Sequence, residues 1–164
     1  MSKDPSISYG RCQTIISLAS LVFLLSCSSS TTIKPFTTDG CSAFPDRSMI
    51  THKDWCNCCV THDFAYWRGG TAAQRLAADQ ALQVCVLQTT GNKSLADTMY
   101  AGVRAGGGPY YFTTYRWGYG WPYGREYKPL SAAESEKANK LEATFRANHP
   151  QMTCESAMAE TSHN

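Results

Sequence analysis

The sequence predicts a mostly α-helical, disulfide-containing protein built on two antiparallel helices, with an aromatic-rich irregular segment and a C-terminal helix. Three observations support this fold class: apolar residues recur at helical spacing, two segments open with capping-box patterns, and eight cysteines occur in only 164 residues. The length is typical of a single domain. The net charge, 15 − 13 = +2, is too small to indicate a nucleic-acid partner.

The first 26 residues have the features of an export signal. Scattered charges precede an apolar run from Ile15 to Leu25, which is too short to span a membrane. The sequence Leu24-Leu25-Ser26-Cys27 resembles a bacterial lipobox, and this resemblance implies that Cys27 is diacylated and becomes the mature N-terminus. An ordinary secretory signal cleaved nearby, or a buried helix, is the alternative interpretation.

The lipobox also implies a location. Ser28 follows the cysteine, whereas an Asp at that position usually retains a lipoprotein in the inner membrane. We therefore expect a bacterial envelope protein, anchored in the outer membrane by acyl chains such as palmitate on Cys27. The expected organisation is a lipoprotein signal peptide (1–26), a polar tether (27–36), a main domain (37–130) and a polar C-terminal helix with a tail (131–164).

The first helix of the main domain is expected over about residues 53–68. Four side chains share one of its faces because they follow one another at steps of four, three and four. These are Trp55, Cys59, His62 and Tyr66. Gly69-Gly70 ends the helix.

The capping box Thr71-Ala72-Ala73-Gln74 opens a second helix, which runs to about residue 87 and ends near Gly91. The short link between the two helices favours an antiparallel pair. A third, shorter helix is expected over about residues 94–103. A further capping box, Ser131-Ala132-Ala133-Glu134, opens a polar helix to about residue 148, which we expect to present a solvated face.

The segment 105–130 is rich in aromatic residues, with nine within residues 110–127. Gly106-Gly107-Gly108-Pro109 breaks any helix at its start, and partial alternation allows a short hairpin. Two interpretations stay open. Most rings pack over the helix pair, or the segment forms a surface that seeks the lipid–water boundary, which Trp and Tyr favour.

Spacing also places a histidine opposite an aspartate. Moving back four residues along the first helix leads from His62 to Cys58, about 6 Å along the axis. Moving forward six residues along the second leads from Asp79 to Cys85, about 9 Å in the same direction if the helices are antiparallel. A bridge between these two cysteines would therefore bring the histidine opposite the aspartate.

At this point the sequence resembles the secreted phospholipases A2, whose signature is Cys-Cys-x-x-His-Asp with a Tyr four residues after the His. The matching residues are Cys58, Cys59, His62, Asp63 and Tyr66, followed on the second helix by Asp79 and, six residues later, Cys85. The loop Asp39-Gly40-Cys41 looks most like the prokaryotic branch of the superfamily. The resemblance covers about residues 37–88 and implies a phospholipase A2-like main domain.

The chemistry assigns a role to each of these side chains. The reference pKa of a histidine, about 6.5, suits His62 to the role of general base, and Asp79, supported by Tyr66, would fix its tautomer. Asp63 points about 100° away from His62 and can bind Ca²⁺. The carboxylate of Asp39 and backbone carbonyls near Gly40 would supply further oxygens. The ion would stabilise the oxyanion of ester hydrolysis.

Six cysteines remain after Cys12 is removed with the signal and Cys27 is acylated, and an even number in an exported chain suggests disulfides. The resemblance implies the pairs Cys41–Cys59 and Cys58–Cys85, which leaves Cys56–Cys154 by elimination. A bridge of the animal enzymes is absent, because Ala65 and Ala78 occupy both of its positions. By residue type, Cys56, Cys58, Cys59 and His62 are also possible zinc ligands.

We therefore expect calcium-dependent hydrolysis of an acyl ester of glycerophospholipids by a membrane-anchored lipoprotein. The alternative is a non-catalytic envelope lipoprotein that uses the same fold to bind lipid or protein. The expected partners are the phospholipid substrate and the membrane, reached through the lipidated Cys27. The sequence indicates no nucleic acid and no particular protein partner.

The lipid anchor is directly testable. We expect Cys27→Ala to yield an unprocessed or soluble protein, because the acylated residue is lost and stable anchoring needs more than one acyl chain. Mass spectrometry of the mature protein measures this. An unmodified N-terminus downstream of Cys27 in the wild-type protein would contradict the lipobox interpretation.

Overall fold

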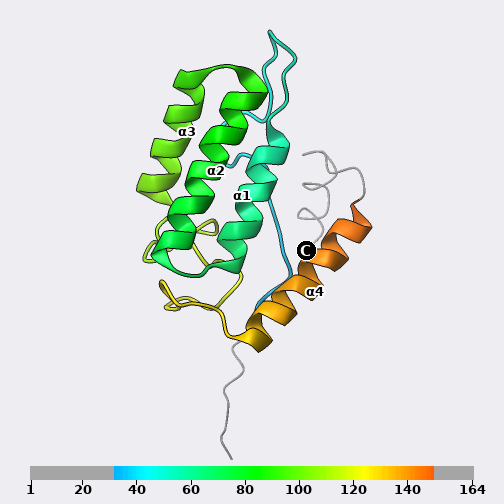
Figure 1. Cartoon of the computed structure of the whole chain (residues 1–164), viewed down its shortest axis with the longest axis vertical. Coiled ribbons are helices and arrows are strands. Elements are labelled where there is room, and N and C mark those ends of the chain that lie inside the picture. Colours follow the sequence, from blue (N-terminus) through cyan, green and yellow to red (C-terminus); the bar gives the residue numbers. More distant parts are fainter. Residues whose placement is uncertain (1–31, 150–164) are drawn as a thin grey trace, which may run out of the picture.

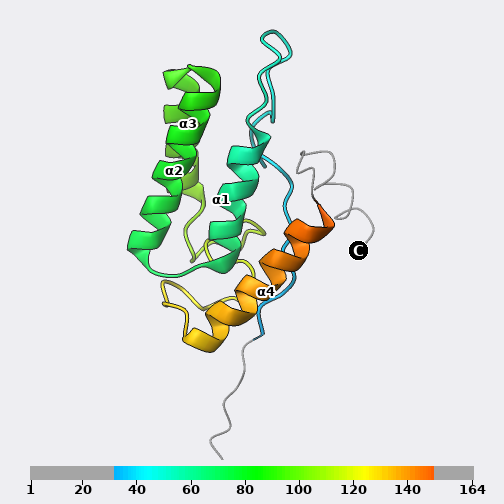
Figure 2. The same ribbon diagram turned by 45° about the vertical axis from the view of Figure 1, so that its right-hand side comes forward.

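Four helices account for most of the structure, a computed structural model that describes residues 32–149. They are α1 (Cys56–Arg68), α2 (Ala72–Thr90), α3 (Lys93–Gly106) and α4 (Ala132–Asn148). Figures 1 and 2 show α1, α2 and α3 side by side, with α4 on the side of α1 away from α3. The predicted mostly helical class is confirmed. The signal peptide, Cys27 and Cys154 lie outside the described residues.

α1 begins at Cys56, whereas the sequence predicted a start near residue 53. Trp55 precedes the helix with a non-helical backbone (φ −117°, ψ 11°), and the Asp54 carboxylate accepts a hydrogen bond from the Cys56 amide at 2.8 Å. Residues 47–54 instead form a protruding loop closed by an antiparallel bridge between Arg47 and Asp54. The pairing across this loop takes the residues before Trp55 out of the helix.

α1 ends at Arg68 and is capped by Gly69, which was predicted to stop it. The backbone there has φ +68°, and a Cβ atom at this position would lie 2.8 Å from the Cα of Gly118. Glycine is therefore required twice, for the left-handed backbone and for the close approach of the aromatic segment. This contact places residues 117–121 against the C-terminal end of α1.

α2 runs antiparallel to α1 after the short link between them (Figure 1). Its predicted capping box is present, since the Thr71 hydroxyl accepts from the Gln74 amide and the Gln74 side chain accepts from the Thr71 amide. The helix extends three residues beyond the predicted residue 87 to Thr90, and the predicted Gly91 caps it in the left-handed conformation. Propensity and capping agree along this segment, which explains why its prediction succeeds.

Two disulfides tie α1 to its neighbours. Cys58 joins Cys85 of α2 with a Cα–Cα distance of 5.7 Å, and Cys59 joins Cys41 of the preceding loop with a distance of 5.0 Å. Both predicted pairs are confirmed. Cys56 is buried, but its predicted partner lies outside the described residues, so the third pair stays a prediction.

The aromatic segment forms turns between α3 and α4, and the described residues show none of the hairpin that alternation allowed. Trp117 and Trp121 are buried and donate their indole N–H groups to the carbonyls of Gly70 and Arg68. The buried Arg116 guanidinium donates to the backbone carbonyls of three residues, which are Trp117, Gly118 and Trp121. Backbone carbonyls that a strand would have paired are satisfied by an arginine instead.

α4 carries the expected solvated face and also a packed one. Ala138 is buried, and the Phe145 ring meets Phe36 and Phe64 edge to face at 4.7 and 5.5 Å between centroids. Phe36 and Ile33 are themselves buried, although both fall in the predicted polar tether. The packed domain thus begins before residue 37, because these two apolar side chains attach the polar stretch to the core.

No helix within residues 32–149 is long and apolar enough to cross a membrane.

The capping of α4 generates a stability prediction. Arg125 donates two hydrogen bonds to the Glu134 carboxylate, at 2.8 and 2.9 Å, and these bonds with the capping contacts to Ser131 lower the pKa of Glu134 to about 2. Because this pKa is depressed in the folded state, the contribution is complete above the ordinary value of 4.5 and is lost as the pH falls towards 2.

We expect Glu134→Gln to lower the free energy of unfolding by about 1–2 kcal/mol at neutral pH, because the ion pair is lost while the amide can still cap. The matched control is Glu136→Gln in the same helix, whose exposed pair with Lys140 should leave the midpoint unchanged. Chemical denaturation at neutral pH and at decreasing pH measures both. If the loss of unfolding free energy in Glu134→Gln were the same at pH 2 as at neutral pH, the charge of Glu134 would not be its cause.

Candidate active site

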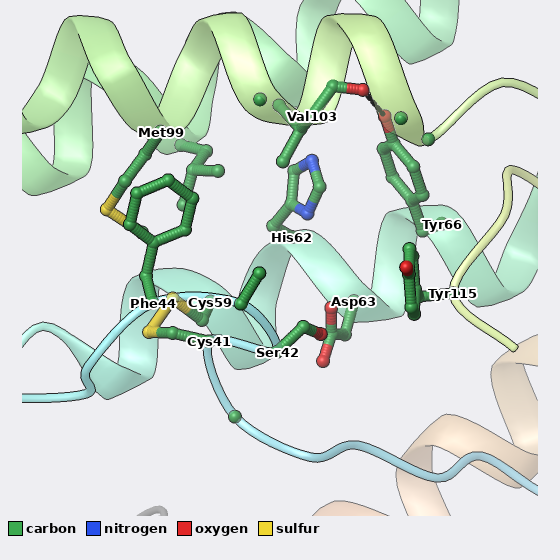
Figure 3. Close-up of a pocket in the computed structure, with 16 residues that line it drawn as sticks. Cys41, Ser42, Phe44, Cys59, His62, Asp63, Tyr66, Met99, Val103 and Tyr115 are labelled. Atoms are coloured by element: carbon green, nitrogen blue, oxygen red, sulfur yellow. Dashed lines mark hydrogen bonds between the residues drawn. A yellow bond between two sulfur atoms is a disulfide. The ribbon is translucent and has the colours of Figure 1, made fainter. Parts of the chain in front are cut away.

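A cavity of about 250 Å³ lies between the first three helices and the loop at residues 40–44. Its walls are largely apolar. Phe44 comes from the loop, Leu82 from α2, and Met99 and Val103 from α3. Figure 3 shows His62 projecting from α1 into this space, with the Cys41–Cys59 disulfide nearby. The cavity therefore combines an apolar lining with the imidazole of His62.

His62 and Asp79 form the pair that their spacing predicted. The ring Nε2 lies 2.8 Å from Asp79 Oδ1, and both side chains are buried. Burial alone would raise the pKa of the Asp79 carboxyl, but its hydrogen bonds, those with His62 and Arg104 foremost, outweigh burial and lower the pKa. The carboxylate is thus an acceptor, so Nε2 donates the proton of this hydrogen bond, and in a neutral ring the lone pair lies on Nδ1. None of the described residues hydrogen-bonds Nδ1.

Tyr66 completes this arrangement from one turn further along α1. Its hydroxyl donates to Asp79 Oδ1 at 2.8 Å and accepts from Arg75 Nε at 3.0 Å. The ring also packs against the His62 imidazole, with centroids 4.2 Å apart. Burial is the main reason why the pKa of Tyr66 is raised, so this hydroxyl stays protonated and remains a donor.

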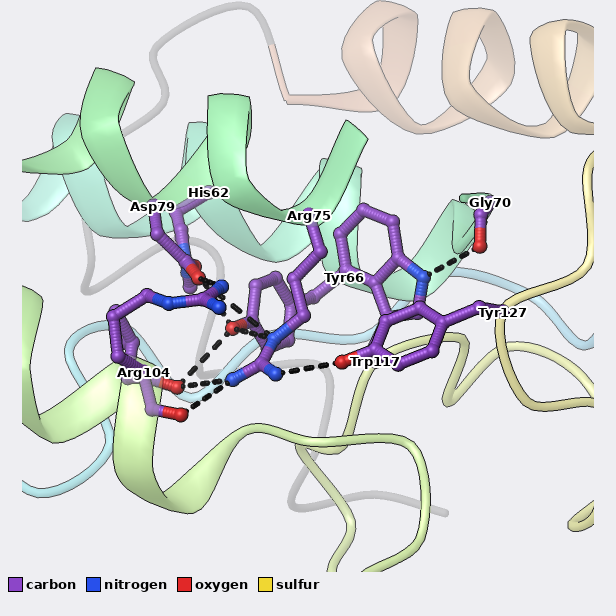
Figure 4. A network of polar contacts seen from close by, with 9 residues as sticks. His62, Tyr66, Gly70, Arg75, Asp79, Arg104, Trp117 and Tyr127 are labelled. Carbon is purple, nitrogen blue, oxygen red and sulfur yellow. Dashed lines mark hydrogen bonds and ion pairs between the residues drawn. The ribbon is translucent and has the colours of Figure 1, made fainter. Parts of the chain in front are cut away.

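Two arginines complete the shell around Asp79 (Figure 4). Arg104 of α3 donates to Asp79 Oδ2 at 2.6 Å, and Arg75 of α2 approaches the same oxygen at 3.7 Å. Arg75 also donates to the carbonyls of Val103 and Arg104 and to the Tyr127 hydroxyl, all within 2.9 Å. The fully buried carboxylate is therefore compensated from three helices.

Asp63 lies at a junction between two hollows. It lines the large cavity and also a smaller one of about 120 Å³, whose wall includes Asp39 and Tyr119. Thr38 donates to Asp63 Oδ2 at 2.5 Å. Burial is the main cause that raises the pKa of Asp63 well above its usual range, and the charge of Asp39 adds to it. This carboxylate is poorly compensated by the protein alone.

The predicted calcium ligands are placed unequally around Asp63. Asp39 lines the small cavity and accepts a hydrogen bond from the Ser42 hydroxyl at 2.7 Å, whereas Gly40 lines the large cavity. Gly40 has φ +74°, and its amide donates to the Thr38 hydroxyl. The loop is thus folded back on Thr38, close to the aspartate that it was predicted to assist.

The alternative zinc site is not formed. Cys58 and Cys59 each take part in a disulfide and cannot act as thiolate ligands. Within residues 32–149 no three side chains of the His, Cys, Asp or Glu type cluster as metal ligands. A cation near Asp63 would therefore depend on backbone, hydroxyl or water oxygens as well as carboxylates.

Sequence reasoning missed Thr38, Arg75 and Arg104. Arg75 carries a local signal, because it lies four residues before Asp79 on α2 and so shares its face. Arg104 and Thr38 lie 25 residues from Asp79 and Asp63 respectively, so only the packing of α3 and of the extended N-terminal segment brings them close.

Comparison with known proteins identifies no relative. The chain matches no family model, and neither a curated protein nor a solved structure is significantly similar to it. The assignment of a function therefore depends on the geometry of the site.

The buried arginine network yields a matched pair of variants. Arg75→Lys should lower the free energy of unfolding by about 2–4 kcal/mol, because a single ammonium cannot reach the acceptors that the planar guanidinium serves. Arg68→Lys should cost below about 1 kcal/mol, since that side chain binds Asn139 and Glu142 at the surface. Urea denaturation with the disulfides intact measures both. Equal losses would contradict the structural role assigned to Arg75.

Proposed function

We propose that the protein hydrolyses an acyl ester of glycerophospholipids with the help of Ca²⁺, as a lipid-anchored, phospholipase A2-like enzyme of the bacterial envelope. The observation that carries the proposal is the buried His62–Asp79 pair, which opens into an apolar cavity beside the buried Asp63. The order of these residues on two disulfide-linked antiparallel helices resembles the secreted phospholipases A2.

The base in this proposal is His62. With Nε2–H held by Asp79, the lone pair of Nδ1 can take a proton from a water molecule, which then attacks the ester carbonyl. Asp79 keeps the ring in this tautomer and stabilises the imidazolium that forms. The proton then passes to the leaving alkoxide, so that a free fatty acid and a lysophospholipid result.

The oxygen atoms around Asp63 fit a hard cation such as Ca²⁺. Asp63 and Asp39 contribute two carboxylates around one small cavity, and Thr38 and Tyr119 add hydroxyl groups to its wall. A cation would offset the burial and the mutual repulsion that raise the pKa of Asp63. When bound, Ca²⁺ would neutralise negative charge that develops on the ester carbonyl oxygen. By resemblance, a Gly40 carbonyl would be the backbone ligand.

The walls of the large cavity fit an acyl chain. Phe44, Leu82, Met99 and Val103 present only apolar atoms from their side chains, and His62 and Asp63 are the ionisable groups among its lining residues besides tyrosines. A substrate with an ester next to a long hydrocarbon would bury that hydrocarbon and exclude water from the base. A purely polar ester would gain little from such a lining.

The catalytic test compares two histidines. We expect His62→Gln to reduce fatty-acid release from mixed phospholipid micelles by about 10²–10⁴-fold, because the proton acceptor is lost. His52→Gln, in the exposed loop, should leave the rate unchanged.

Asp63→Asn should weaken calcium binding, and a chelator should abolish activity in the wild-type protein.

Two results would redirect the proposal. If the oxidised wild-type protein neither binds Ca²⁺ nor hydrolyses ester, the fold serves a non-catalytic binding role. If hydrolysis survives both chelator and His62→Gln, the activity is correct but the mechanism is not.

A further inference from the structure

We propose that an exposed aromatic surface, formed by Tyr110, Tyr111, Phe112, Tyr115 and Tyr123, docks on the bilayer that carries the lipid anchor. The inference rests on the lipid anchor and the lipid substrate proposed above, and it assigns the face that meets the membrane. The five side chains are exposed, Phe112 to 86%. They lie beyond the part of the chain that resembles phospholipases A2.

The side chains of the aromatic surface are held in place by contacts with one another. The rings of Phe112 and Tyr123 stack with centroids 4.1 Å apart, and the Tyr123 hydroxyl donates to the Tyr110 carbonyl at 2.7 Å. Tyr110 in turn meets Tyr127 edge to face. Large rings that are packed against each other and still face solvent have an unused apolar face, which is typical of an interaction surface.

This surface is uncharged. Residues 106–124 contain one charged side chain, Arg116, and it is buried against backbone carbonyls. Both tryptophans of the segment are buried, whereas the five rings of the aromatic surface are exposed. Tyrosine favours the boundary between lipid and water because its ring is apolar and its hydroxyl is polar. An electrically neutral lipid surface, such as one of phosphatidylcholine, is therefore a suitable partner.

The place where the described chain begins indicates that this partner is the membrane that holds the lipid anchor. The Lys34 amide donates to the Gly120 carbonyl at 2.8 Å, and the Tyr119 hydroxyl donates to the Thr37 carbonyl at 2.6 Å. The start of the described chain is therefore fixed beside the aromatic segment, at the end of the molecule opposite the loop at residues 47–54 (Figures 1 and 2). Cys27 precedes Thr32 by five residues, which span at most about 18 Å.

Tyr115 connects this surface to the cavities. It is one of the exposed rings, and it also lines both the large and the small cavity, beside Asp63 (Figure 3). Docking through the aromatic surface would therefore bring the cavities to the lipid surface. A phospholipid would then leave the bilayer without crossing open water.

The test uses two tryptophan reporters in the full chain, combined with phosphatidylcholine vesicles whose acyl chains are brominated. Phe112→Trp places a reporter on the aromatic surface, and Ile50→Trp places one at the opposite end, where the native side chain is 91% exposed. We expect about a twofold loss of reporter emission for Phe112→Trp and no loss for Ile50→Trp, after subtraction of the wild-type signal.

The outcomes separate this inference from the proposed function. An unquenched Phe112→Trp reporter, or stronger quenching of Ile50→Trp, would overturn the inference, even in a protein that hydrolyses phospholipid. A quenched Phe112→Trp reporter in a protein without activity would support docking and contradict hydrolysis. If the Phe112→Trp reporter is equally shielded from water with and without vesicles, the surface is covered by a second copy of the chain. That result would also overturn the inference.

A second variant follows from the link through Tyr115. We expect Phe112→Ser to slow release of fatty acid from vesicles several-fold, while hydrolysis of a monomeric short-chain phospholipid is unchanged. Equal rates for this variant and the wild-type protein on vesicles would contradict the docking role of Phe112.

Discussion

The buried carboxylate of Asp79 is the constraint on which the rest of the structure depends. An isolated anion in a protein interior is destabilising by several kcal/mol, so this one must be compensated by groups around it. His62 and Tyr66 do so from α1, Arg75 from α2 itself, and Arg104 from α3. A shift of any of the three helices would remove at least one of these partners, so one side chain constrains their relative positions.

Arginines also hold the irregular backbone in place. Arg75 binds the last carbonyls of α3, and Arg116 binds the turns of the aromatic segment, where no regular element could satisfy them. A guanidinium presents five donors in a fixed plane, so it can order several carbonyls at once. The glycine-rich connection between α3 and α4 therefore has a defined shape, although the described residues form no sheet.

The parts that could be predicted from the sequence are those that local chemistry determines. The limits of α2 follow from a capping box and a glycine, and the His62–Asp79 pair follows from helical spacing once Cys58 and Cys85 are joined. The partners of these residues could not be predicted in the same way. Arg104 reaches Asp79 only because α3 packs on α2, and Phe36 becomes buried because it packs between Phe64 of α1 and Phe145 of α4. Contacts between residues far apart in the chain produce no hydrophobic periodicity in a polar stretch of the sequence.

The two disulfides beside His62 have a consequence for where the site can exist. Cys58 and Cys59 lie in the first turn of the helix that carries the histidine, and their partners fix α2 and the loop before α1. Thiols stay reduced in a bacterial cytoplasm and become oxidised after export. In the proposed envelope location, a chain still inside the cell would lack both cross-links, so the site would be fully cross-linked only in the compartment beyond the inner membrane. For the proposed hydrolysis of membrane lipids, the redox state of the compartment would then act as a safeguard during synthesis.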